Sequence, residues 1–164
     1  MSATESTEAP TSLQAGLPPA QLKYVPLPFP LPIDANAIPL TASEGMRLPC
    51  RRCLLDAQPG EVVNLIAYDP FPEESVTPYR GNGPIFVHAH DCGLFRGDTL
   101  PESQLQRMLS VRAYDENHMM CGAEVVEGSE LERVAGEMLA DEKARYINVH
   151  NAKPGCFAVR VERA

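Results

Sequence analysis

The spacing of proline in the N-terminal part of the chain is the strongest constraint on its fold. Eight prolines lie between Pro18 and Pro49, and residues 24–32 (YVPLPFPLP) alternate proline with apolar residues. Proline fixes φ and has no N–H to donate, so this stretch forms neither a regular helix nor a central strand. We expect an extended strap over residues 21–45, with its apolar side chains lying across the domain. The alternative is a polyproline ligand for an SH3 or WW domain, which would make the chain a protein-interaction module.

The segments on either side of the strap differ in composition. Residues 1–20 contain mainly Ser, Thr, Glu, Ala and Pro, and such a stretch cannot offset the entropy of ordering, so we expect a disordered tail. The chain has 164 residues, of which 44% are hydrophobic and 22% charged, enough for one core of ordinary size. Residues 46–164 are therefore predicted to form a single domain.

Charge and cysteine content narrow the class of protein. The chain has 22 acidic against 14 basic residues, a formal net charge of -8, which disfavours a nucleic-acid partner. No apolar run approaches the roughly 18 residues of a membrane helix, and the start MSATESTEAP does not resemble a secretory signal. Five cysteines, an odd number, favour free or metal-bound thiols. We expect a soluble cytoplasmic protein that binds no nucleic acid and no membrane.

The rest of the chain is predicted to form strands with one clear helix. Ser129 followed by Glu132 has the spacing of a capping box, and residues 131–139 place their apolar side chains on one helical stripe. A second, short helix is predicted over residues 100–108. Apolar segments predict strands at 61–68, 84–90, 111–114, 118–126, 146–150 and 156–161. Short links between the later strands favour hairpins, so the predicted fold is α+β, with a mainly antiparallel sheet and the helix packed on one face.

Alternation along the strands divides the side chains between two faces of the sheet. In the last hairpin Ile147 and Val149 share the core face with Val161 and Val159. In the middle hairpin the same rule groups Val111, Ala113, Met119, Cys121, Ala123 and Val125. The opposite face carries polar groups, among them Arg112, Tyr114, Asn148, His150 and Arg160.

The polar face leads to the first functional hypothesis, a binding site for a small anionic or polar ligand. Arginine supplies charge, while tyrosine and asparagine supply hydrogen bonds. The predicted ligand-binding residues are Tyr79, Arg80, Arg112, Asn151 and Cys50. For Arg80 the alternative is an ordinary rigid turn in which it pairs with an acidic neighbour. The sequence does not decide whether the protein is an enzyme.

A second hypothesis is a zinc or other transition-metal site. Cys50 and Cys53 form a C-x-x-C turn, and His88 and His90 lie two residues apart on a predicted strand, where they would project to one face. The predicted metal ligands are Cys50, Cys53, His88, His90 and Cys92. The alternative is that the cysteines are small buried hydrophobic residues and the histidines lie at a solvated strand end.

Several short runs resemble a bacterial family known as domain of unknown function 1203. They span about residues 47–163 and read LPCR (48–51), LDA (55–57), PGE (59–61), PYR (78–80), GPIFV (83–87), LSVRAYD (109–115), VVEG (125–128) and HNAKPGC (150–156). The resemblance implies no reaction, cofactor or catalytic residue. Similar proteins often lack cysteine at the position of Cys53 and carry arginine at that of His88. The resemblance therefore implies that a metal site using both residues is particular to this branch.

Overall fold

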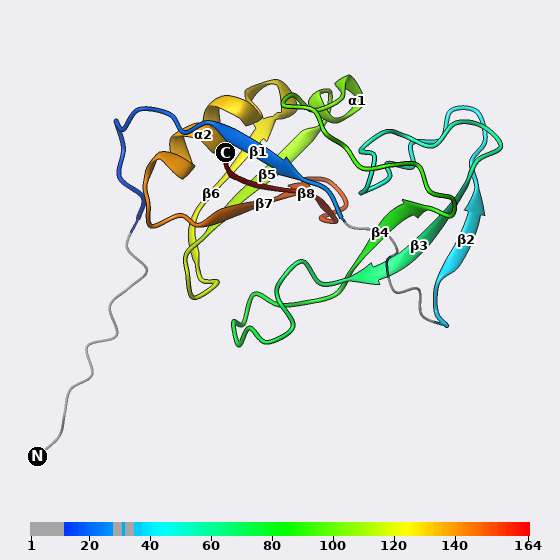
Figure 1. The fold of residues 1–164 in the computed structure, drawn as a ribbon, viewed down its shortest axis with the longest axis horizontal. Helices are drawn as coiled ribbons and strands as arrows, with labels where there is room; N and C mark the ends of the chain where they lie inside the picture. Colours follow the sequence, from blue (N-terminus) through cyan, green and yellow to red (C-terminus); the bar gives the residue numbers. More distant parts are fainter. Residues whose placement is uncertain (1–11, 28–30, 32–34) are drawn as a thin grey trace, which may run out of the picture.

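Two antiparallel sheets form the framework of the protein (Figure 1). The computed structural model describes residues 12–27, 31 and 35–164. The five-stranded sheet has the order β1 (Leu22–Val25), β8 (Phe157–Arg163), β7 (Tyr146–Asn151), β5 (Met108–Tyr114) and β6 (Met120–Glu127). The three-stranded sheet has the order β2 (Ile38–Thr41), β3 (Val62–Tyr68) and β4 (Gly83–His88). The α+β class with antiparallel pairing is confirmed, and the strands divide between two sheets.

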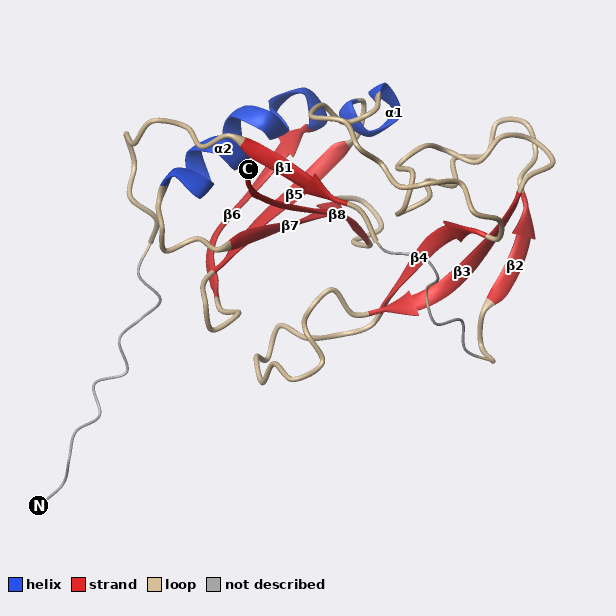
Figure 2. Ribbon diagram, viewed as in Figure 1, coloured by secondary structure: helices blue, strands red, loops and turns tan. Residues whose placement is uncertain are grey.

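Helix α2 (Leu131–Ala140) covers one face of the five-stranded sheet. The short helix α1 (Glu102–Leu105) lies near the N-terminal end of α2 (Figure 2). Both predicted helices are present. The expected capping box is wrong: Ser129 lies in a 3₁₀ turn, η1 (Gly128–Glu130), and α2 begins after Glu130 without a side-chain cap. The 3₁₀ turn leads the chain directly into the helix, so no extended N-cap residue precedes it. No helix in the described part of the chain is long and apolar enough to cross a membrane.

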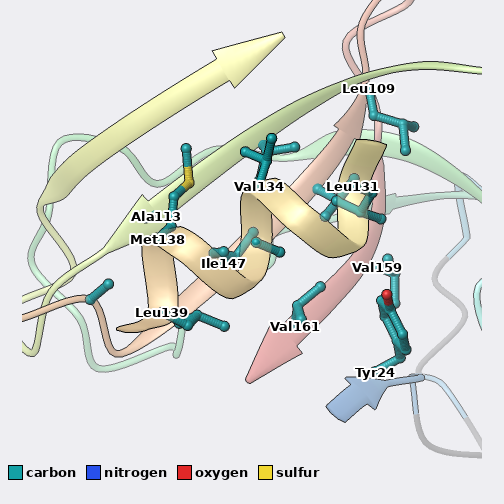
Figure 3. Close-up of a cluster of buried hydrophobic side chains, with 14 of the residues drawn as sticks. Tyr24, Leu109, Ala113, Leu131, Val134, Met138, Leu139, Ile147, Val159 and Val161 are labelled. Carbon is teal, nitrogen blue, oxygen red and sulfur yellow. The ribbon is translucent and has the colours of Figure 1, made fainter. Parts of the chain in front are cut away.

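The main core lies between α2 and the five-stranded sheet (Figure 3). Ile147 pairs with Val161 and Val149 with Val159, and all four side chains are buried, which confirms the predicted core face of the last hairpin. The fully buried side chains of this cluster include Leu109, Val111, Leu131, Leu139, Ile147, Val149 and Val161. Burial of each large aliphatic side chain contributes about 1.5–3 kcal/mol, so this cluster supplies much of the stability.

The predicted assignment of faces is reversed in β6 between Ala123 and Val125. Val111 pairs with Glu124, while Ala123 and Val125 pair with Arg112 and Ser110 on the other face. Val125 is 60% exposed as a result. A bulge in β6 opposite Ala113 and Tyr114 adds one residue to that strand, and a shift of one residue moves the following side chains to the other face.

The proline-rich strap contributes an edge strand to each sheet. β1 pairs with β8, and β2 pairs with β3. Tyr24 and Leu27 are buried and belong to two different apolar clusters of the domain. Residues 28–30 and 32–34 of the alternating stretch lie outside the described residues.

Part of the predicted tail also contacts the domain. The Ala20 N–H donates to the Gly136 carbonyl at 2.9 Å, and Leu13 packs against the main core. Gln14 donates its N–H to Asp141 beyond the end of α2. Residues 1–11 of the predicted tail lie outside the described residues.

Candidate metal centre

The C-x-x-C turn is held against the end of β4. Cys50 forms a parallel bridge with Phe86, and the Arg51 N–H donates to the Phe86 carbonyl at 3.1 Å. The Leu54 N–H donates to the Cys50 carbonyl at 3.0 Å and closes the turn. These bonds bring Cys50 and Cys53 next to His88, the last residue of β4.

Four side chains from three segments converge here. The Sγ and imidazole nitrogen atoms of Cys50, Cys53, His88 and Cys92 all lie within 4.8 Å of one another. Cys50 Sγ lies 3.7 Å from Cys92 Sγ, and Cys53 Sγ lies 3.6 Å from His88 Nδ1. Tetrahedral zinc with bonds of about 2.3 Å to sulfur and about 2.0 Å to nitrogen separates its ligands by about 3.8 Å (S to S) and about 3.6 Å (S to N). These two distances therefore match two edges of a tetrahedral zinc site.

The outer contacts orient these ligands. His88 is buried, and its Nε2 lies 2.9 Å from Glu61 Oε2, which leaves Nδ1 facing Cys53. A carboxylate on the second ring nitrogen fixes the tautomer and raises the basicity of a metal-binding histidine. The same contact, together with the Gln58 N–H, lowers the pKa of Glu61; the Gln58 bond is the larger cause.

The sulfur of Cys50 is surrounded by donors. It accepts the backbone N–H of His88 at 3.3 Å and that of Arg52 at 3.4 Å, and the whole residue is buried. The Cys53 side chain and these backbone donors lower the pKa of Cys50, although burial opposes the shift, while the pKa of Cys53 is raised by its contact with Cys50 and by burial. Cys50 thus loses its proton readily, and Cys53 loses its proton when a metal ion binds in the proton's place.

Arg52 provides positive charge beside the thiols. Its guanidinium is 2% exposed, and it donates from Nη1 to Cys92 Sγ at 3.6 Å and from Nη2 to Asp91 Oδ1 at 2.9 Å. A tetrahedral zinc with three thiolates carries a net charge of about -1. Arg52 is placed to balance that charge.

Two of the cysteines are followed by left-handed backbone. Leu54 follows Cys53 with φ 62°, and Gly93 follows Cys92 with φ 77°. The left-handed region is unfavourable for leucine, by about 1 kcal/mol or more, and such strain is concentrated at functional sites. At both cysteines the chain turns sharply just after the sulfur-bearing residue.

His90 lies outside this group of four. β4 ends at His88, so the alternation that would have placed both histidines on one face stops there. His90 is exposed and belongs to a second, smaller group of ligand atoms with Glu61 and His88. Cys92, four residues after His88, is the fourth member of the group, and the turn after β4 brings it there.

The predicted ligand-binding residues of the sheet face lie in several places. Arg80 pairs with Asp69 at 3.0 Å and donates to two loop carbonyls, which agrees with the alternative of a rigid turn. Tyr79 packs edge-on against Tyr114, and Arg112 donates to Ser110 on the same strand.

The two remaining residues of that prediction lie elsewhere. Cys50 belongs to the cluster of three cysteines and His88, and Asn151 lines a separate groove beside the β7–β8 hairpin. A single ligand contacting all five residues stays a prediction.

The sequence-based prediction contained all four members of the cluster but not Glu61. Glu61 precedes His88 by 27 residues, and only the pairing of β3 with β4 brings them together. No spacing rule connects Glu61 with the cysteines and the histidine.

The fold and the cluster define a class: an α+β protein of two antiparallel sheets with a group of three cysteines and one histidine beside the smaller sheet. The chain belongs to the family described as protein of unknown function (DUF1203), whose model matches residues 47–163. Comparisons with curated proteins and with solved structures found no match.

Proposed function

We propose that this protein binds one zinc ion through Cys50, Cys53, His88 and Cys92. The observation that carries the proposal is the pair of distances across the cluster: 3.7 Å between the sulfurs of Cys50 and Cys92, and 3.6 Å between Cys53 Sγ and His88 Nδ1. Both agree with the edges of a zinc tetrahedron, about 3.8 Å and about 3.6 Å.

The donor set favours zinc over calcium and magnesium. Thiolate sulfur and imidazole nitrogen are soft or intermediate ligands, whereas calcium and magnesium take oxygen. With four protein ligands around a tetrahedral ion, no position is left open for water or substrate. The ion is therefore structural in this proposal.

A structural ion has a clear task in this part of the fold. The cluster joins the turn at residues 50–53, the end of β4 and the loop that carries Cys92. The nearby apolar cluster is small, and its buried members are Ala42, Leu48, Ala57 and Val63. Because so small a cluster contributes little burial energy, the free energy of metal binding would stabilise the three-stranded sheet.

Metal analysis of the full chain tests the proposal. Protein purified under reducing conditions without chelators is expected to contain about one zinc ion per chain, as measured by inductively coupled plasma mass spectrometry. Cys92→Ser and His88→Ala are each expected to lose most of it. Cys156→Ser is the matched control, because Cys156 is also a half-buried free cysteine but lies outside the cluster.

Thiol counting separates zinc from the main competing chemistry, a disulfide between Cys50 and Cys92. Denatured and chelated wild-type protein should titrate as five free thiols, the number in the sequence. A loss of two thiols together with an absence of zinc would overturn the proposal. So would a metal content in Cys92→Ser equal to that of the wild type.

A further inference from the structure

A groove of about 610 Å³ lies on the other side of the C-x-x-C turn, between the smaller sheet and the β7–β8 hairpin. Leu65 and Phe86 line it from β3 and β4, and Met108 lines it from the start of β5. Its volume is within the range of small-molecule sites, about 300–1,000 Å³. The apolar walls are suited to a ligand with a hydrocarbon or aromatic part.

Positive charge is concentrated around the groove. Arg47, Arg51, Arg107 and Lys153 all line it, and among the described residues no acidic side chain does so. Arg107 pairs with Asp56 at 3.1 Å, whereas the exposed Arg47 and Lys153 form no ion pair with any residue that the structure describes. In a chain with a net charge of -8, this local excess of cations marks a surface for an anion.

Arg51 is a buried cation at the floor of the groove. It is 2% exposed, and its guanidinium donates to the carbonyls of Phe157 at 2.7 Å and Pro49 at 2.6 Å and to Cys156 Sγ at 3.3 Å. In the described part of the chain no carboxylate pairs with it. Burying an arginine without an opposite charge is unfavourable, and an anion in the groove would supply that charge.

Asn151, which also lines the groove, has an unsatisfied hydrogen-bond acceptor. It is 6% exposed, and its Nδ2 donates to Cys156 Sγ at 3.4 Å. Its buried Oδ1 has no hydrogen-bond partner among the described residues. An acceptor left in this state costs about 1–3 kcal/mol unless a donor reaches it, and the donor can come from a ligand in the groove that Asn151 lines.

We propose that this groove binds a small organic anion. Its carboxylate or phosphate lies beside Arg51, Arg107 and Lys153, and a hydroxyl or amine of the same molecule donates to Asn151 Oδ1. Its apolar part packs on Leu65, Phe86 and Met108. This site is separate from the metal cluster and does not depend on the proposed zinc ion, although the turn between Cys50 and Cys53 carries Arg51.

Binding of anilinonaphthalene sulfonate, an aromatic anion whose fluorescence rises in apolar sites, tests the groove in the full chain. The double variant Arg47→Glu/Lys153→Glu changes only exposed side chains and is expected to weaken binding about tenfold or more. Arg96→Glu is the matched control, because Arg96 is also exposed and does not line the groove. Equal affinities in the double variant and the wild type, or an equal loss in the control, would overturn the proposal.

Competition identifies the acidic group. Displacement of the probe from wild-type protein by phenyl phosphate but not by benzoate assigns a phosphate site, and the reverse assigns a carboxylate site. Displacement by both supports a general anion site. If neither competes, or if neutral benzyl alcohol competes equally, the groove is not an anion site. Zinc content measured on the same double variant should equal that of the wild type, so failure of this proposal and failure of the metal proposal are distinguishable.

Discussion

Arg51 and Arg52 are adjacent in the chain, but their guanidinium groups reach two different sites. Arg51 donates to Cys156 Sγ at 3.3 Å in the groove, and Arg52 donates to Cys92 Sγ at 3.6 Å in the proposed metal site. Both are buried. One short turn, flanked by two of the proposed zinc ligands, therefore serves both sites.

This relationship predicts that substitutions at the two neighbouring arginines weaken binding at different sites. Arg52→Gln removes the cation beside the thiolates and is expected to weaken zinc binding about tenfold or more, because hydrogen bonds to charged groups contribute about 1.5–3 kcal/mol. Arg51→Gln should leave zinc affinity within about threefold of the wild type and should weaken binding of the anionic probe. Zinc affinity is measured by competition with a chromophoric chelator. Equal losses of zinc affinity in the two variants would contradict the separation of the sites.

Glu61→Gln tests the outer contact of His88. The amide keeps the size of the side chain but removes the negative charge from the group that lies 2.9 Å from His88 Nε2. Loss of such a contact typically lowers metal affinity about 10- to 100-fold. The same chelator competition measures the effect, with the exposed Glu74→Gln as control. A wild-type affinity in Glu61→Gln would show that the carboxylate does not orient the ligand.

The members of the cysteine and histidine cluster could be predicted from sequence more fully than their surroundings. Cysteine and histidine have few roles, and the C-x-x-C spacing limits Cys50 and Cys53 to one turn, so these residues could be singled out without a structure. The expected set also contained His90, because a regular strand was assumed to continue past His88. Leu54 gave no signal, because a left-handed position is normally marked by glycine.

His150 predicts a pH dependence of stability. Burial lowers the pKa of His150 from 6.5 to about 4 in the folded protein, while its Nδ1 contact with the Gly155 carbonyl opposes the shift. Between these values the unfolded chain binds more protons than the folded chain, so the free energy of unfolding decreases as pH falls from 6.5 towards 4.

Thermal unfolding of wild type and His150→Gln across this pH range isolates the contribution of the histidine. The wild type should lose more Tm on acidification than the variant, because glutamine does not titrate. Parallel Tm curves for the two proteins between pH 6.5 and about 4 would show that His150 is not responsible.

Asn148 predicts a stabilising substitution. It is fully buried on β7, and neither Nδ2 nor Oδ1 has a hydrogen-bond partner among the residues that the structure describes. Asn148→Leu is expected to raise the free energy of unfolding by about 1–2 kcal/mol, because it removes two unsatisfied polar atoms and keeps the branched shape of the side chain. Chemical denaturation measures the free energy of unfolding of each variant. Asn148→Ala, which leaves a cavity, should be less stable than Asn148→Leu. A loss of stability in Asn148→Leu would mean that the amide is satisfied in solution.

For the fold as well, the features that depend on local sequence could be predicted, and those that depend on contacts between distant segments could not. The apolar stripe of α2 and the hairpin from Tyr146 to Arg163 depend on local periodicity, and both were predicted. Division of the strands into two sheets depends on pairings between distant segments, such as β1 with β8, which no local pattern encodes. The groove was missed for the same reason, because its lining residues come from segments as far apart as Arg47 and Cys156.

X-ray absorption at the zinc edge tests the central proposal most directly, because it counts the atoms bound to the ion. In wild-type protein we predict three sulfur atoms at about 2.3 Å and one nitrogen at about 2.0 Å. In His88→Ala reconstituted with zinc, the nitrogen of the imidazole should be replaced by a light atom from solvent, with loss of the multiple-scattering pattern of the ring. A first shell of oxygen and nitrogen without sulfur in the wild-type protein would contradict the account.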